Sequence, residues 1–256
     1  MTEVSTAKEK NTKTENKIIV ALDVPTADEA RKIIAEIKTE VGAFKIGLQL
    51  FTAAGASFVR EVVSAGNKVF LDVKFHDIPN TVAKASIEVA RLGVWMFNLH
   101  ASGGGEMMRR TISEVAEFCE KENLERPKII GVTVLTSSGE KTLKETGIAE
   151  NAESQVLRLA ELSANCGLDG VVASPLETKT IRENIGQKDF LIITPGVRPD
   201  FGANKTNDGT NDDQKRVKNP KSAIADGADY LVIGRPILQA ENKLKALRQI
   251  LEEINS

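Results

Sequence analysis

The sequence predicts an α/β protein of one domain, a closed (β/α)8 or TIM barrel. Short apolar runs rich in β-branched residues recur along the 256 residues, and most of them are followed by a segment with helical periodicity. There are eight such runs, and they are mostly apolar on both faces, as buried parallel strands are. Eight strand–helix units of this length favour a closed barrel over a doubly wound open sheet. Periodicity alone leaves that open sheet as the alternative.

The expected strands are evenly spread along the chain. They cover residues 18–23, 43–48, 68–74, 95–100, 128–135, 170–173, 190–194 and 230–233. A capping box formed by Thr26 and Glu29 predicts a helix that ends near residue 38. Further helices are expected up to residue 65, over residues 80–92, 105–121 and 153–166, from Pro175 onward, and over residues 236–253.

Composition excludes several classes of protein. The 34 basic and 36 acidic residues give a net charge of −2, and only 4% of the residues are aromatic, which argues against a nucleic-acid-binding surface. Cys119 and Cys166 lie far apart, so neither a disulfide framework nor a zinc motif is expected. No apolar run is long enough to span a membrane, so no membrane partner is expected.

The first sixteen residues differ from the rest of the chain. They are polar and lack the hydrophobic stretch of a signal peptide. We therefore expect a disordered tail over residues 1–16, a barrel domain over residues 17–256, and a cytoplasmic location.

Charged residues gather where the first three strands are expected to end, at the face of a barrel that carries active sites. They are Asp23, Lys45, Asp72, Lys74 and Asp77. Residues two apart in a strand share a face, so Asp72 and Lys74 are expected to point the same way. A salt-bridge network that only ties strand ends together is the alternative, but buried charge networks stabilise proteins poorly. Asp72 and Asp77 also leave open a site for a divalent metal ion.

A second group of residues is suited to binding phosphate. Gly234 and Arg235 follow the eighth expected strand, and Arg198 follows the seventh. The loops after these two strands often bind phosphate in barrel enzymes, and arginine can bind two phosphate oxygens at once. The alternative is an ordinary turn with a surface arginine. The segment between Pro195 and Pro220 is long and polar, as functional loops often are.

The run Phe70–Thr81, FLDVKFHDIPNT, closely resembles the signature of the orotidine 5'-phosphate decarboxylase family. Other segments resemble that family in the same order, from Lys17 to the last helix, and the set is similar to its longer bacterial branch. They are VALD (20–23), FKIG (44–47), GVWM (93–96), HASGG (100–104), VTVLT (132–136), CGLDGVV (166–172), TPGVRP (194–199) and VIGRP (232–236).

The resemblance implies the last step of de novo UMP synthesis, in which orotidine 5'-monophosphate loses carbon dioxide. It implies no metal and no organic cofactor, and a homodimer in which Asp77 and Thr81 reach the partner's site. Lys45, Asp72, Lys74 and Asp77 would form the charged array, and Lys74 would protonate C6. Asp23 and Lys45 would bind the ribose, Thr136 the base, Pro195 the ring face, and Arg198, Gln214, Gly234 and Arg235 the phosphate, with Gln214 also near the base.

Two other functions compete with the decarboxylase. A metal-dependent enzyme acting on a sugar phosphate, such as a keto-gulonate phosphate decarboxylase or an epimerase, can use an Asp-x-Lys-x-x-Asp pattern to hold magnesium. A barrel that binds nucleotide without turnover is the other. The intact strand-three run, Phe70–Thr81, favours the cofactor-free decarboxylase.

Overall fold

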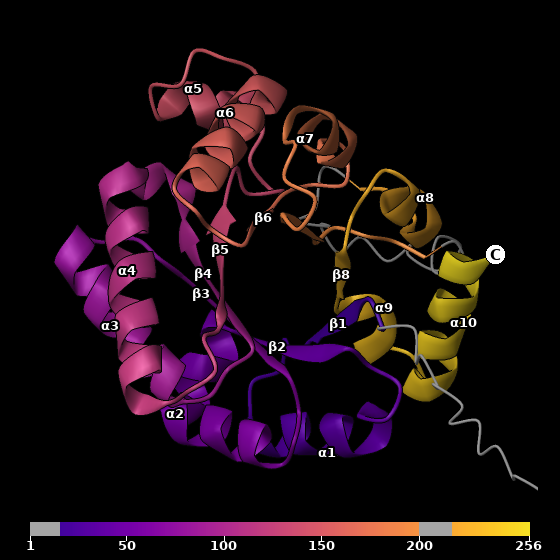
Figure 1. Cartoon of the computed structure of the whole chain (residues 1–256). Coiled ribbons are helices and arrows are strands. Elements are labelled where there is room, and N and C mark those ends of the chain that lie inside the picture. Colours follow the sequence, from indigo (N-terminus) through magenta and orange to yellow (C-terminus); the bar gives the residue numbers. More distant parts are fainter. Residues whose placement is uncertain (1–15, 200–216) are drawn as a thin grey trace, which may run out of the picture.

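Eight parallel strands close into a barrel in the order of the sequence (Figure 1), as the sequence predicts. The structure is a computed structural model that describes residues 16–199 and 217–256. Closure is decided by the pairing of β1 with β8, in which Ile19 lies opposite Val232. The open sheet is thereby excluded. The strands are β1 (Ile18–Ala21), β2 (Ala43–Gly47), β3 (Val69–Phe75), β4 (Met96–His100), β5 (Lys128–Val132), β6 (Gly170–Val172), β7 (Leu191–Thr194) and β8 (Tyr230–Ile233).

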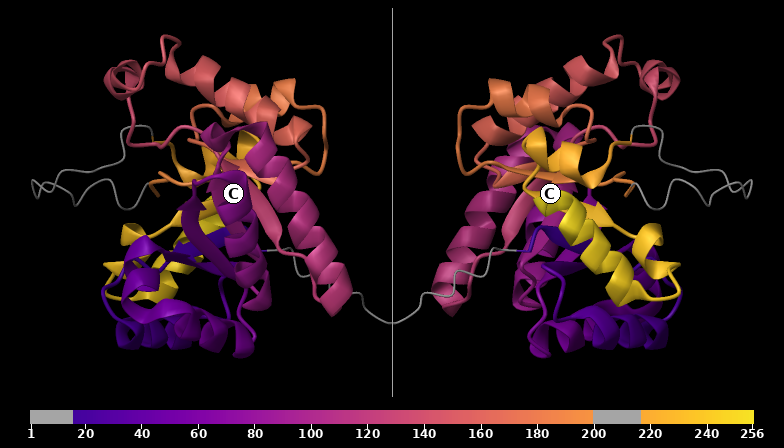
Figure 2. Two further views of the ribbon diagram at one scale, coloured as in Figure 1. Left: turned by 90° about the vertical axis from the view of Figure 1, so that its left-hand side faces the viewer. Right: turned by 90° about the vertical axis from the view of Figure 1, so that its right-hand side faces the viewer.

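Helices surround the barrel on its outside, and side views show the same arrangement (Figures 1 and 2). They are α1 (Ala27–Ile37), α2 (Leu48–Ser64), α3 (Pro79–Arg91), α4 (Gly104–Glu122), α5 (Glu140–Glu145), α6 (Ala152–Asn165), α7 (Thr178–Asn184), α8 (Pro220–Ala225), α9 (Arg235–Leu238) and α10 (Lys243–Asn255). The last helix, α10, contacts both α8 and α1, so the ring of helices also closes.

Two apolar clusters make up the core. The larger cluster fills the layer between strands and helices, and the smaller one fills the barrel interior with residues such as Ile19, Ala43 and Phe70. Alternate residues of a strand share a face, so the residue two positions after an inward one also points inward. Lys45 follows Ala43 in this way, and Asp72 follows Phe70, so both lie nearer the carboxyl ends of their strands. The polar site is therefore the continuation of the apolar interior.

The structure corrects several element boundaries. Two helices that the periodicity did not predict, α5 and α8, are six residues long and bury only one or two side chains each, too few to produce a periodic signal. The single expected helix over residues 236–253 is two helices, because Asn242 accepts a hydrogen bond from the Lys245 amide and starts α10 anew. The helix expected from Pro175 begins at Thr178.

The predicted tail, residues 1–16, lies outside the described residues except for Asn16. The Asn16 side chain, just before β1, accepts a hydrogen bond from the Ile18 amide and donates one to the Glu40 carbonyl. No helix in the described part of the chain is long and apolar enough to cross a membrane.

Candidate active site

A cavity of about 450 Å3 opens at the carboxyl ends of the strands. Its volume falls within the range of small-molecule sites, about 300–1,000 Å3. Most of the residues that the sequence singled out line it: Asp23, Lys45, Asp72, Lys74, Thr136, Pro195, Arg198, Gly234 and Arg235. The cavity thus joins the charged residues of β1 to β3 with the arginines that follow β7 and β8.

The charged side chains on one side of the cavity form a continuous chain of alternating sign. Lys45 Nζ lies 3.0 Å from Asp23 Oδ1 and 3.3 Å from Asp72 Oδ2. Lys74 Nζ lies 2.6 Å from Asp72 Oδ1. Both oxygens of the Asp72 carboxylate therefore face an ammonium group, and Asp72 is the centre of the network.

The network keeps its central groups charged although they are buried. Burial by itself lowers the pKa of Lys45, but the carboxylates of Asp72 and Asp23 outweigh it and hold the pKa above its ordinary value. Burial likewise raises the pKa of Asp72, and the ammonium groups of Lys45 and Lys74 outweigh it, so that the pKa is lowered. Asp72 is thus a carboxylate and Lys45 an ammonium at neutral pH.

Lys74 reaches Asp72 through an unusual backbone. Its φ is +52°, in the left-handed region, which costs a residue with a side chain about 1–3 kcal/mol. The register between β3 and β4 also shifts between Leu71 and Phe75. Simple strand alternation predicted correctly that Asp72 and Lys74 meet, but they meet across an irregular strand end.

Asn98, on β4, contacts this irregularity from the neighbouring strand. It donates a hydrogen bond to Asp72 Oδ1 at 2.7 Å and accepts one from the Lys74 amide at 2.8 Å. Asn98 lies within the strand expected over residues 95–100, but the sequence gave no reason to select it. A polar residue among the apolar side chains of a strand was the only available signal.

Gly47 gives the Lys45 ammonium the room that it needs. A Cβ at position 47 would lie 2.8 Å from Lys45 Nζ, closer than such atoms approach one another. Since Lys45 is held by two carboxylates, it has little freedom to move aside. The glycine of the FKIG run is therefore part of the site, although nothing in the sequence by itself indicated a spatial reason for it.

Arg198 and Arg235 line the same cavity, where the chain leaves β7 and β8. Val197 and Arg198 pair with Lys218, and we call this pairing the stem. The Arg198 amide donates a hydrogen bond to the Lys218 carbonyl at 2.9 Å, and Val197 forms a bridge with Lys218. Arg235 opens α9, a helix of only four residues, so the helix dipole adds little to any anion site there. The guanidinium groups, rather than the helix end, are the features suited to phosphate.

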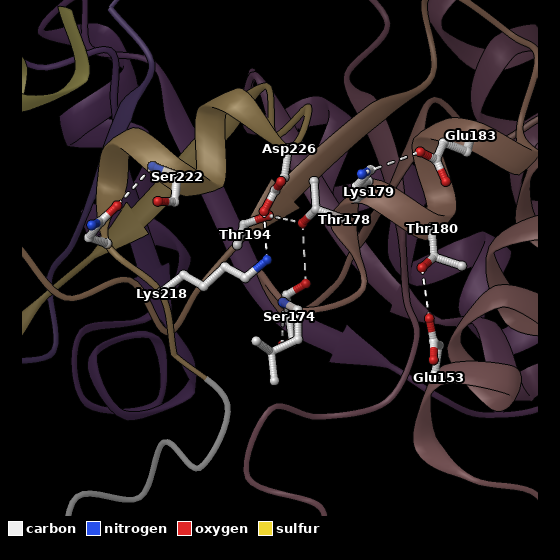
Figure 3. A network of polar contacts seen from close by, with 12 residues as sticks. Glu153, Ser174, Thr178, Lys179, Thr180, Glu183, Thr194, Lys218, Ser222 and Asp226 are labelled. Carbon is white, nitrogen blue, oxygen red and sulfur yellow. Dashed lines mark hydrogen bonds and ion pairs between the residues drawn. The ribbon is translucent and has the colours of Figure 1, made fainter. Parts of the chain in front are cut away.

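Figure 3 shows polar contacts near Lys218, the residue that pairs with Val197, and near the end of β7. Lys218 Nζ lies 2.6 Å from Asp226 Oδ2, directly after α8. Thr194, the last residue of β7, is fully buried, and its hydroxyl lies 3.5 Å from that of Thr178 on α7. Pro195, which lines the cavity, is therefore carried by a strand end that is tied to α7.

Known proteins resemble the chain over most of its length. The model of the family described as "Orotidine 5'-phosphate decarboxylase / HUMPS family" matches residues 16–250. Proteins named orotidine 5'-phosphate decarboxylase from Geotalea daltonii and Geobacter sulfurreducens are each 51% identical, over 93% of this chain and 95% of theirs. The chain belongs to the orotidine 5'-phosphate decarboxylase / HUMPS family. Relatives this similar identify it as an enzyme.

A solved structure agrees with this assignment of the family. The crystal structure of orotidine 5'-phosphate decarboxylase from Lactobacillus acidophilus has a TM-score of 0.81 and 34% identity, over 94% of this chain and 100% of that chain. The fold of this chain is thus that of a solved orotidine 5'-phosphate decarboxylase.

Asp77 and Thr81 do not join the cavity of their own chain. Both side chains are exposed, and neither belongs to the described residues that line the cavity. The Asp77 carboxylate accepts a hydrogen bond from the Ile78 amide at 2.7 Å, and the Ile78 side chain is 66% exposed. Within one copy of this family member, the charged array therefore contains Asp23, Lys45, Asp72 and Lys74 but not Asp77.

Two histidines lie together near the charged network, and two expectations from the sequence concern a metal ion and Gln214. The rings of His76 and His100 lie 5.5 Å apart, and burial and neighbouring positive charge lower the pKa of His100. Within residues 16–199 and 217–256 no group of three or more His, Cys, Asp or Glu side chains is arranged to hold a metal ion. Gln214 lies outside the described residues, so its place in the phosphate site stays a prediction.

Proposed function

We propose that the chain converts orotidine 5'-monophosphate to UMP and carbon dioxide, the last step of de novo pyrimidine nucleotide synthesis. The observation that carries this proposal is the Lys45–Asp72–Lys74 network, with Lys45 and Asp72 largely buried, in a cavity that Arg198 and Arg235 also line. A charged network beside the reacting carbon and cationic groups for the phosphate are what this reaction requires.

Lys74 has the central chemical role in this proposal. When the bond between C6 and the carboxylate breaks, carbon dioxide leaves and the electron pair stays on C6, where no conventional electron sink exists. A fixed ammonium beside C6 stabilises that negative charge as it develops. The Lys74 ammonium then gives a proton to C6, which forms UMP, and the amine regains a proton from solvent.

Asp72 acts on the substrate carboxylate in the same scheme. Two like charges about 4 Å apart repel one another by about 1 kcal/mol in water and about 4 kcal/mol at an effective dielectric constant of 20. Enzymes lower reaction barriers by about 8–23 kcal/mol, so this repulsion supplies only part of the acceleration. The rest must include binding energy from remote groups, above all the phosphate.

The remaining residues bind the other parts of the nucleotide in our proposal. Asp23 and Lys45 bind ribose hydroxyls, Thr136 binds the base, and Pro195 packs against the ring. Arg198, Gln214, Gly234 and Arg235 bind the phosphate, and Gln214 also lies near the base. The support for these roles is that all of these residues except Gln214 line the same cavity.

We also propose a homodimer in which Asp77 and Thr81 complete the partner's site. Both residues are exposed, neither lines the cavity of its own chain, and Asp77 is followed by the exposed Ile78. The cytoplasmic location expected from the sequence stays a prediction.

The surroundings of the Asp72 and Asp77 carboxylates support the cofactor-free reaction over the magnesium-dependent alternative. Asp72 would be a ligand of the metal ion in that alternative, but ammonium groups occupy the positions next to both of its oxygens. Asp77, the second carboxylate of the pattern, is outside the cavity. A metal ion would have to displace Lys45 and Lys74 before it could bind Asp72.

The experiment is an absorbance assay of purified protein with orotidine 5'-monophosphate, run with and without EDTA. We expect rapid loss of the orotate absorbance at the same rate in both samples. No loss of absorbance, but binding of UMP, would favour the non-catalytic nucleotide-binding barrel. Turnover of a sugar phosphate that EDTA abolishes would favour the metal-dependent enzyme.

A further inference from the structure

The carboxyl end of β3 is irregular at the two residues that the chemistry needs. Leu71 pairs with Phe97 and Phe75 pairs with Leu99, so β3 advances four residues while β4 advances two. The extra residues form a bulge that contains Asp72 and Lys74. Without a contact to hold it, a bulge of this kind would relax toward regular pairing and carry both side chains with it.

Asn98 fills the gap that the bulge opens. Its side chain is 1% exposed, and it lies on β4 between the two paired positions, Phe97 and Leu99. The Lys74 amide can only donate, so the Asn98 carbonyl must face it, and the amide NH2 is then directed to the Asp72 carboxylate, which can only accept. One side chain therefore satisfies both the backbone and the carboxylate of the bulge.

We infer that Asn98 is a positioning residue that holds Lys74 in its left-handed conformation and fixes the rotation of the Asp72 carboxylate. The expected effect on turnover rests on the proposed function, whereas the hydrogen bonds of Asn98 do not depend on it. Asn98 is not among the described residues that line the cavity, so it acts through Asp72 and Lys74. The three donors to Asp72, two ammonium groups and the Asn98 amide, together leave its carboxylate a single orientation.

The first test compares two substitutions in purified full-length protein. Asn98→Leu keeps a side chain of similar size but removes both hydrogen bonds. We expect kcat for orotidine 5'-monophosphate to fall by at least about 100-fold, because a displacement of about 1 Å in a reacting group has an effect of that order. UMP affinity should change by less than about threefold, since Asn98 does not line the cavity.

Thr111→Val is the matched control for Asn98→Leu. Thr111 is fully buried in α4 and donates to the Met107 carbonyl at 2.8 Å, so the control also removes a buried hydrogen bond. Its kcat should equal that of the unaltered protein. A kcat for Asn98→Leu within about threefold of this control would overturn the inference.

Asn98→Asp tests the inference through the pH dependence of kcat, which a purely structural role of Asn98 would leave unchanged. When the new carboxyl is protonated, it can donate to Asp72 and accept from the Lys74 amide, as the asparagine does. When it is ionised, it repels Asp72, and this repulsion together with burial raises its pKa. We therefore expect the ratio of variant to unaltered kcat to rise several-fold as the pH is lowered from about 8 to about 6.

The unaltered protein is the reference for this pH profile, because it contains the same neighbouring titratable groups. They are Asp72 and Lys74 of β3, Lys45 of β2, His100 of β4, and His76 directly after β3. A ratio that does not change with pH would overturn the inference, including in the case that Asn98→Leu does not fold.

Crystal structures of the variants separate this inference from the proposed function. We expect Lys74 to leave the left-handed region and its contact with Asp72 to lengthen, in Asn98→Leu or in Asn98→Asp at about pH 8. An unaltered protein that does not consume orotidine 5'-monophosphate would refute the proposed function alone. An unchanged Lys74 backbone in the variant structures would refute the positioning role of Asn98 whatever the reaction is.

Discussion

The ammonium of Lys45 lies 3.3 Å from Asp72 Oδ2 on the neighbouring strand, and the two side chains are only 10% and 13% exposed. Each group keeps its charge in the interior because the other is present. Such a pair stabilises a fold weakly when intact, but loss of one partner leaves an uncompensated buried charge. The pair is therefore sensitive to substitution and to pH.

Lys45→Met should lower the free energy of unfolding by about 3 kcal/mol at neutral pH, because it removes one partner of a buried pair. The folded-state pKa of Asp72 is lowered, so its stabilisation is complete above about pH 5 and is lost as the pH falls through the folded-state pKa. The difference between variant and unaltered protein should shrink below about pH 4. Urea unfolding at several pH values measures it.

The Lys45 side of the pair limits stability at high pH, as Asp72 does at low pH. Its folded-state pKa is raised, so its contribution is complete below the ordinary lysine pKa and is lost as the pH rises through the folded-state value. Lys179→Met, at an exposed lysine 3.8 Å from Glu183, is the control and should change stability by less than about 0.5 kcal/mol. Equal effects of the two substitutions would contradict the buried-pair interpretation.

Lys74→Ala should abolish turnover of orotidine 5'-monophosphate, with kcat lowered by at least about 1,000-fold, because it removes both the charge and the proton beside C6. The fold should persist, since the Lys74 side chain is partly exposed and is not buried in the core. The absorbance assay and far-UV circular dichroism measure the two properties. Turnover near that of a Lys179→Ala control would refute the assigned role of Lys74.

Mixing two inactive variants tests the shared site. In a hybrid dimer of Lys74→Ala and Asp77→Ala, one site carries both defects and the other carries neither. Random exchange of subunits makes half of the dimers hybrid, so about a quarter of all sites should be intact. Activity should rise to that level after the two variants are unfolded and refolded together. A mixture that stays inactive would mean that Asp77 serves its own chain. Full activity of Asp77→Ala by itself would mean that Asp77 has no role.

Arg235→Ala should weaken binding of UMP by about 10- to 100-fold, the amount expected for one or two hydrogen bonds to a charged group. Uridine lacks the phosphate, so its affinity should not change. Titration calorimetry with both ligands measures the difference. Arg248→Ala in α10, which breaks an ion pair with Glu40, is the control and should affect neither ligand. Equal losses for UMP and uridine would place Arg235 away from the phosphate.

Lys218→Met should raise KM for orotidine 5'-monophosphate by about tenfold, because Lys218 anchors the stem that carries Arg198 through its 2.6 Å contact with Asp226. Lys218→Arg keeps the charge and should restore most of the affinity. Steady-state kinetics on the two variants provide the comparison. Identical KM values for Lys218→Met and the unaltered protein would show that the stem is held by its backbone contacts alone.

The fold was predictable because strands that are buried on both faces are visible as apolar runs. The strand Tyr230–Ile233 has the expected bounds, and the other strands differ by a few residues at their ends. The short helices α5 and α8 were not predicted, since a helix of six residues with one or two buried side chains leaves no periodic pattern.

The sequence by itself determined the eight strand–helix units, the family resemblance and the residue types that carry charge at the strand ends, because strand periodicity and local motifs are properties of neighbouring residues. Only the tertiary structure decided that the strands close into a barrel, through the pairing of β1 with β8, and which of the charged residues meet. Asp23, Lys45 and Asp72 converge because three parallel strands end at one face of the barrel, whereas Asp77 is exposed outside its own cavity. The role of Asn98 was likewise undecidable from the sequence, because it depends on a register shift between two strands.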